Sequence, residues 1–330
     1  MRFVRPLLFI VTLLLMVELS FRIYLFGPVS LNPRKMNSFS EVHRSGMTQA
    51  ASIPAVYFEL KPDLDTWYKG APFITNGQGL RDDEYPLVKE DGTFRVAVLG
   101  SSWTMGSGVK LQEIWHSVIE QQLNKDLAPL KFEFINFGVD QYGIGEIIAT
   151  LDNKVAAYGP DLVIIAITQY TPTIAWPDPP VAYVEQPRRN PFLESYALRV
   201  MDLTLGLSLY NDSDERRPDA WEPGQVRRQL EKAVGHITRF SDRYEVPVVL
   251  VKLAYSGAWQ SKKPGYEQYL ASASDKLIFF NTLKSVRSHG YKPKELRISN
   301  WDSHPNVLAH QLLAEAVLQG LQENRLLPGK

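Results

Sequence analysis

Short apolar runs alternate with amphipathic stretches through most of this chain, and this alternation limits the folds open to it. The most continuous run is DLVIIAIT, residues 161–168. A strand that is apolar on both faces is typical of a parallel sheet covered by helices on its two sides. Further strands are predicted at 94–100, 132–138, 247–255 and 276–283.

Apolar residues at helical spacing fill the segments between these runs. They predict helices at 112–126, 144–158, 224–245 and 306–324, the last with Asn306 as N-cap. The whole pattern predicts an α/β fold, a three-layer, doubly wound, mostly parallel sheet. Functional groups in such folds gather beyond the carboxyl ends of the strands, which points to the loops 100–109, 138–143, 168–175, 255–264 and 298–306.

The first 27 residues are set apart by composition. Arg2 and Arg5 precede an apolar stretch from Pro6 to Phe26, which as a helix is roughly 31 Å long, enough to cross a bilayer. Within it, Glu18 and Arg22 are four residues apart and can pair. A cleaved signal peptide and a buried core helix are the alternatives. We interpret residues 1–27 as an uncleaved signal-anchor, with residues 6–26 in the bilayer and the globular part outside the cytoplasm, in the periplasm.

The remaining chain divides into a lead-in and one main domain. Residues 28–92 are interpreted as a polar tether followed by an irregular lead-in that packs on the domain. The domain itself is expected to span 93–330. An insertion at about 171–223, with an apolar helix-like piece near 193–210, is too long for a bare loop and is predicted to overhang the crevice.

Composition excludes several kinds of function. Basic and acidic residues number 36 each, so no overall charge favours nucleic acid. The chain has no cysteine, which excludes disulfides and thiol chemistry. Its six histidines show no metal-binding spacing.

Two motifs carry residues suited to nucleophilic chemistry. VAVLGSSWTMGSGV (96–109) places Ser102 at a strand-to-helix junction; taken alone, it also fits a small-residue turn or a phosphate loop. In NWDSHPN (300–306), Asp302 and His304 are two apart, so in an extended segment they point the same way and the carboxylate can orient the imidazole. A surface loop with capping residues is the alternative for this second motif.

Together these motifs resemble blocks of the SGNH (GDSL) hydrolases. VLGSSWTMGSGV is similar to their first block, INFGVDQYG to the second, PDLVIIAITQY lies where the third belongs, and DSHPN matches the last. The lead-in and an apolar N-terminal helix resemble those of membrane-anchored bacterial members. The resemblance implies a flavodoxin-like fold and ester hydrolysis or acyl transfer through an acyl-serine. It implies no metal and no organic cofactor.

Carried over by position, Ser102 is the nucleophile, His304 the base and Asp302 its orienting partner. The N–H of Ser102 helps to form the oxyanion hole. Ser101 replaces the aspartate of the family's first block, a residue that is mainly structural there, so this change is tolerable. Two further departures concern the oxyanion hole: Gln141 replaces the second-block glycine and Tyr170 the third-block asparagine. Gln169 or the Tyr170 hydroxyl can supply the missing donor, or the hole is degraded.

Other residues are assigned lesser roles. Asn136 and Asn306 are expected to brace loops, His310 to be structural, and Trp115 and His116 to pack or lie on a helix surface. Arg81 is expected to pair with Asp82 or Asp83 at the surface, with anion binding as the alternative. Trp103, Trp176 and Trp259 are candidates for stacking on sugar rings, against core packing.

The sequence therefore favours a membrane-anchored esterase or O-acyltransferase. Its expected substrate is an acylated small molecule or polysaccharide, or a lipid. The alternative is a catalytically degraded relative that binds a glycan or an envelope protein partner.

Overall fold

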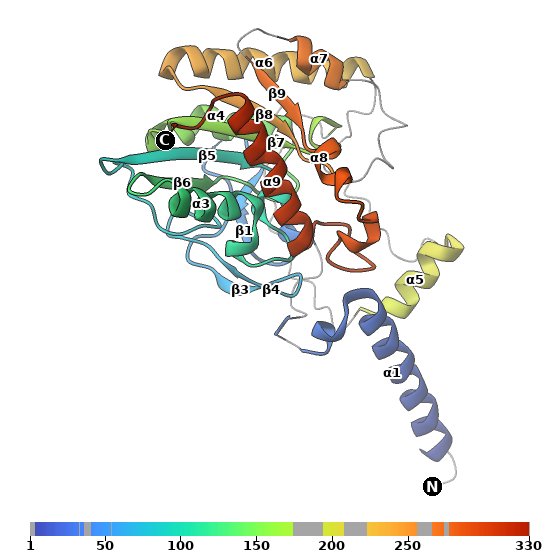
Figure 1. Cartoon of the computed structure of the whole chain (residues 1–330). Coiled ribbons are helices and arrows are strands. Elements are labelled where there is room, and N and C mark those ends of the chain that lie inside the picture. Colours follow the sequence, from blue (N-terminus) through green and yellow to red (C-terminus); the bar gives the residue numbers. More distant parts are fainter. Residues whose placement is uncertain are drawn as a thin grey trace.

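The fold is taken from a computed structural model, which describes residues 4–32, 34–35, 41–53, 55–173, 194–207, 223–255, 266–273 and 277–329. Its centre is a five-stranded sheet in the order β6-β5-β7-β8-β9, with every neighbouring pair parallel (Figure 1). The strands are β5 (Thr93–Gly100), β6 (Lys131–Asn136), β7 (Leu162–Ile167), β8 (Val248–Lys252) and β9 (Ile278–Asn281). Numbered from β5, the order is 2-1-3-4-5, a doubly wound arrangement. The predicted fold class is confirmed.

Helices cover both faces of this sheet (Figure 1). Side chains Val96 and Val98 of β5 belong to an apolar cluster with α3 (Trp115–Asp126) and α9 (Val307–Glu323). The alternating residues Ala97 and Leu99 belong to a second cluster with α4 (Ile144–Asn153) and α6 (Pro223–Tyr244). Successive strand residues point to opposite faces, so a strand buried on both sides must be apolar throughout.

The helices differ from the sequence predictions mainly at their ends. The predicted helix 144–158 ends at Asn153, and a separate 3-10 turn, Val155–Tyr158, closes on Gly159 with a left-handed φ of 55°. Asn306 caps α9 as predicted, since its side chain accepts from the N–H of Ala309 at 3.0 Å. The shorter helices are α2 (Ser102–Met105), α7 (Tyr266–Ser272) and α8 (Leu283–Ser288).

The lead-in before β5 is more regular than the sequence indicated. It contains two antiparallel pairs, β1 (Thr48–Ala50) with β2 (Phe58–Leu60) and β3 (Asp65–Tyr68) with β4 (Ala71–Ile74). Lys69 and Gly70 join β3 to β4 with φ values of 49° and 85°, the left-handed pair that a tight hairpin turn requires. Side chains of the lead-in, among them Val42 and Phe58, are buried in the cluster shared with α4 and α6.

Two helices lie away from the sheet. Helix α1 (Val4–Phe26) projects from the rest of the molecule, with α5 (Tyr196–Leu205) beside it (Figure 1). By length and composition α1 is able to cross a membrane, although a signal sequence meets the same criterion. The Glu18–Arg22 pair predicted within it is present, with the guanidinium Nε 2.7 Å from the carboxylate. Helix α5 occupies the predicted helix-like piece of the insertion.

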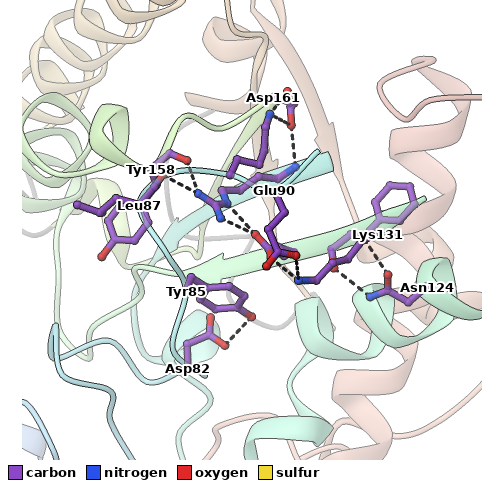
Figure 2. Close-up of polar contacts among 12 residues, drawn as sticks. Asp82, Tyr85, Leu87, Glu90, Asn124, Lys131, Tyr158 and Asp161 are labelled. Atoms are coloured by element: carbon purple, nitrogen blue, oxygen red, sulfur yellow. Dashed lines mark hydrogen bonds and ion pairs between the residues drawn. The ribbon is translucent and has the colours of Figure 1, made fainter. Parts of the chain in front are cut away.

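A buried ion pair ties the amino ends of β5 and β6 together. Arg95 Nη2 lies 2.7 Å from Glu133 Oε2, and both side chains are almost fully buried. Figure 2 shows the surroundings of this pair, in which Lys131 reaches the second Glu133 oxygen at 2.9 Å and the Tyr158 carbonyl accepts from Arg95 at 2.7 Å. This edge of the sheet is the one opposite Ser102, so its role is structural.

Replacing Glu133 with glutamine tests that role. The Arg95 charge would stay buried without its anionic partner, so we expect Glu133→Gln to lower the free energy of unfolding by about 3–5 kcal/mol. Glu231→Gln, which removes an exposed partner of Arg227, is the matched control and should change stability little. Urea denaturation followed by circular dichroism measures both; equal stabilities would contradict the structural role.

Candidate active site

Ser102 is the first residue of α2, directly after β5. The loop around it is packed so closely that larger residues do not fit: a Cβ at Gly100 would lie 2.8 Å from the Ala166 carbonyl oxygen, and one at Gly138 2.6 Å from the Met105 nitrogen. Within the described ranges, the backbone N–H of Ser102 has no hydrogen-bond acceptor. A serine hydroxyl at the carboxyl edge of a parallel sheet, with a free N–H beside it, is an arrangement suited to acyl transfer.

Arg81 holds the segment that follows Ser102. Its buried guanidinium donates to the carbonyls of Met105 at 2.8 Å and Val109 at 2.5 Å, and also to that of Gly106. The predicted surface ion pair with Asp82 or Asp83 is therefore wrong. The Met105 and Val109 carbonyl oxygens, which have no backbone donor in the described residues, are thus satisfied by an arginine from the lead-in.

Asp302 and His304 are in direct contact. One carboxylate oxygen of Asp302 bonds to the ring Nδ1 of His304 and accepts from the His304 backbone N–H at 2.9 Å. The contact arises from a turn closed by the aspartate side chain, rather than from the alternation of an extended segment that the sequence suggested. With Nδ1 engaged, Nε2 is the nitrogen left to take a proton.

A short chain of contacts links the segments that carry Ser102 and His304. Trp103, next to Ser102, stacks on Tyr255 with ring centroids 5.0 Å apart. The Tyr255 hydroxyl donates to the carbonyl of Ser303, the residue between Asp302 and His304. The Ser102 hydroxyl and the His304 ring are not hydrogen-bonded to each other in the structure; in enzymes without substrate, such bonds are commonly long.

The two departures from the family motif also lie at this edge. Gln141 has a φ of 65°, the left-handed conformation that the glycine of the family adopts more easily. Tyr170 follows β7 and is about two-fifths exposed. Burial first, and then Asp302, raise the pKa of Tyr255 to about 12. Gln169 lies beside Tyr170, half-buried.

The sequence analysis missed Lys69, at the tip of the β3–β4 hairpin. Its ammonium donates to Asp302 Oδ2 at 2.6 Å and lies 3.4 Å from His304 Nδ1. The side chain is only 7% exposed. A lone lysine before a glycine in a turn usually points into solvent, so the sequence carried no signal of its position. We infer that Lys69 positions Asp302.

The charges of this cluster support one another. Burial opposes ionisation of Asp302, yet His304 and Lys69 hold the pKa of its carboxyl well below the usual range. Burial alone would lower the pKa of Lys69, but Asp302 and Asp140 raise it above its ordinary value. Both groups are therefore charged at neutral pH, and a permanent carboxylate faces His304.

The remaining candidates are structural. His116 and His310 are fully buried, and burial lowers the pKa of each to about 3, so both are neutral. Asn136 braces its loop by accepting from the Gly138 N–H at 2.9 Å. Trp103 and Trp115 are packed in the core, whereas Trp176 and Trp259 lie outside the described residues. In the part of the chain that the structure describes, no group of three His, Asp or Glu side chains is placed to hold a metal ion.

Comparisons with known proteins were made by sequence and by structure. No family model and no curated protein matches the chain. Among solved structures, a catalytic mutant of Axe2, an acetylxylan esterase from Geobacillus stearothermophilus, is 16% identical with a TM-score of 0.44, over 69% of this chain and 94% of its own. A two-domain esterase active on acetylated mannans is 16% identical with a TM-score of 0.44, over 70% of this chain and 49% of its own.

A third solved structure is a member of the lipolytic G-D-S-L family from Veillonella parvula. It is 13% identical, with a TM-score of 0.40, over 68% of this chain and 97% of its own. The neighbours are thus esterases and a G-D-S-L protein, the class whose motifs this sequence resembles. The fold assignment rests on the strand order and helix layers described above.

The role of Lys69 is tested with Lys69→Met. Asp302 Oδ2 would lose the ammonium that donates to it at 2.6 Å, so the carboxylate is held less firmly against His304. We expect kcat/KM for p-nitrophenyl acetate to fall about tenfold or more because the Asp302–His304 geometry loosens. The loss should appear in kcat rather than in KM, since Lys69 acts through Asp302.

Lys69→Arg keeps the charge and should restore most of kcat. Lys61→Met, in the same lead-in, removes a lysine that donates to the carbonyl of Gly46 instead. It should leave kcat unchanged. A Lys69→Met enzyme with the wild-type kcat would show that the lysine does not act on the Asp302–His304 pair.

Proposed function

We propose that this protein is a serine esterase or O-acyltransferase of the SGNH type. The observation that carries the proposal is the buried Lys69–Asp302–His304 cluster at the sheet edge where Ser102 ends the β5 loop. Two motifs from distant parts of the chain meet there through Trp103, Tyr255 and Ser303. Each motif alone admits a structural explanation, but their meeting at the functional edge of a doubly wound sheet favours catalysis.

The reaction follows from the roles of these groups. The Ser102 Oγ attacks an ester carbonyl carbon while His304 Nε2 takes the hydroxyl proton, and Asp302 stabilises the resulting imidazolium. The tetrahedral oxyanion accepts a hydrogen bond from the N–H of Ser102. Collapse breaks the bond to the alcohol oxygen, which leaves with the proton from His304. Water or an acceptor hydroxyl then attacks the acyl-serine, giving hydrolysis or transfer respectively.

The nucleophile is tested with the full-length protein in detergent. A fluorophosphonate probe should label the wild type and fail to label Ser102→Ala, because the phosphonyl group bonds only to an activated serine. Labelling of Asp302→Asn should be strongly slowed, since His304 loses its orienting carboxylate. The adjacent substitution Ser101→Ala is the matched control and should leave labelling intact.

The alternative function is binding without catalysis, of a glycan or an envelope partner. Gln141 and Tyr170 favour it, because loss of one oxyanion donor typically costs about 10²–10³ in rate. A wild-type protein that is folded, unlabelled and inactive on p-nitrophenyl acetate would establish this alternative in place of the esterase.

We further propose that the Tyr170 hydroxyl replaces the missing amide donor of the oxyanion hole. Its place just after β7, the strand beside β5, supports this role. Tyr170→Phe should lower kcat by about 10²-fold with KM little changed, as expected for a donor used only in the transition state. Gln169→Ala is the matched control and should change kcat little. A larger loss of kcat in Gln169→Ala than in Tyr170→Phe would assign the donor to Gln169.

A further inference from the structure

The last turn of α1 is hydrogen-bonded to the loop that carries Asp302 and His304. The side-chain amide of Asn300 donates to the Tyr24 carbonyl at 3.0 Å, and the Trp301 N–H lies 3.4 Å from the Leu25 carbonyl oxygen. The Trp301 ring meets Phe26 edge-on at 6.5 Å. The membrane-type helix is therefore in contact with a residue adjacent to Asp302.

Helix α5 is fixed to the same part of α1. The Glu18 carboxylate accepts from the Ser195 hydroxyl at 2.9 Å and from the N–H groups of Tyr196 and Ala197 at 3.0 and 3.1 Å, so it caps α5 from the side of α1. Arg22 donates to the Glu194 carbonyl at 2.9 Å. The ionisable pair inside the apolar helix thus has a structural purpose, which is to hold α5 beside the upper half of α1.

The outer side of α5 is apolar and exposed. Leu198, Met201 and Leu205 are 47%, 47% and 62% exposed, and they recur at the spacing of one helix face. The polar neighbour Arg199 points elsewhere, over the Trp301 ring at 5.9 Å. An apolar face of this kind that is continuous with a membrane-type helix matches a helix lying in the bilayer interface.

The length of α1 sets the depth. Its 23 residues span about 34 Å at 1.5 Å per residue, against a hydrocarbon core of about 30 Å. When about the first 20 residues of α1 fill the core, its last turn and Trp301 lie at the headgroup level, where tryptophan is favoured. Glu18 and the start of α5 then lie about 8 Å below that turn, within the depth that an interfacial helix reaches. The loop holding Asp302 and His304 then lies at the membrane surface.

We propose that α5 lies in the membrane interface beside α1 and that the active site opens onto the bilayer surface, where it takes an ester carried by a lipid. The lipid-borne substrate rests on the proposed esterase function, whereas the placement of α5 in the interface does not. A lipid-borne ester is the substrate that a catalytic loop held at this depth meets without leaving the membrane surface.

The placement is tested by single nitroxide labels, for which the absence of cysteine in the chain is well suited. Leu205→Cys on α5 and Leu87→Cys before β5 are similarly exposed, at 62% and 55%. The labelled full-length protein is reconstituted in phosphatidylcholine vesicles and examined by electron paramagnetic resonance. We expect the label at 205 to collide mainly with oxygen, and the label at 87 mainly with a water-soluble nickel chelate. Equal nickel accessibility at both positions would overturn the proposal.

The use of a lipid-borne ester is tested with the triple variant Leu198→Ser, Met201→Ser, Leu205→Ser. Its kcat/KM for p-nitrophenyl palmitate in phosphatidylcholine vesicles should fall about tenfold or more, because its interfacial face is lost. Turnover of soluble p-nitrophenyl acetate and fluorophosphonate labelling should stay as in the wild type. The control variant Leu87→Ser, Val88→Ser should behave as the wild type on both esters.

The two proposals fail in different ways. Wild-type and triple-variant proteins that hydrolyse both esters equally would overturn the lipid-borne substrate and leave the esterase intact. A wild type that is neither labelled nor active would overturn the esterase function and with it the lipid-borne substrate. The nitroxide measurement would still decide where α5 lies.

Discussion

The Asp302 carboxylate is the point at which three distant parts of this chain meet. One oxygen accepts from the ring and the backbone of His304, and the other accepts from Lys69 at the tip of the lead-in hairpin. A buried carboxylate is costly unless its oxygens are satisfied by charge and hydrogen bonds. The lead-in is therefore required for the site, since without Lys69 the Asp302 carboxylate would keep only its hydrogen bonds to His304.

Gln141 shows the same dependence on the lead-in. A non-glycine residue with a φ of 65° is strained by about 1–2 kcal/mol and persists only where its surroundings fix it. Its neighbours are held on both sides: Asp140 accepts from Tyr68 at 2.8 Å, and Tyr142 donates to the Phe58 carbonyl at 2.6 Å. The left-handed φ of Gln141 is thus maintained by neighbours that are hydrogen-bonded to the lead-in.

The sheet and its helices could be predicted because the burial of their residues follows the periodicity of apolar residues along each short segment. In β7, Val163 and Ile165 face one cluster and Leu162 and Ile164 the other. This strand is therefore apolar along its whole length, which is the pattern that predicted a parallel sheet. Lys69 and Arg81 could not be found in this way. Each is a charged residue in a polar, turn-rich segment, and each is buried only because a loop from elsewhere in the fold presents oxygens to it. Long-range satisfaction of this kind leaves no periodicity in the sequence.

The Glu18–Arg22 pair lies between these two cases. Its spacing predicted an ion pair, but not that the carboxylate would also cap α5 or that the guanidinium would reach Glu194. Those bonds make the upper half of α1 part of the folded structure rather than a passive tether, because Arg22, Leu25 and Phe26 are buried there. Removing α1 would leave the N-terminal N–H groups of α5 and the Asn300–Trp301 loop without their partners. The geometry of Asp302 and the position of α1 are consequently coupled, so a change in activity measured on a chain without α1 would include any disturbance of the Asp302–His304 loop.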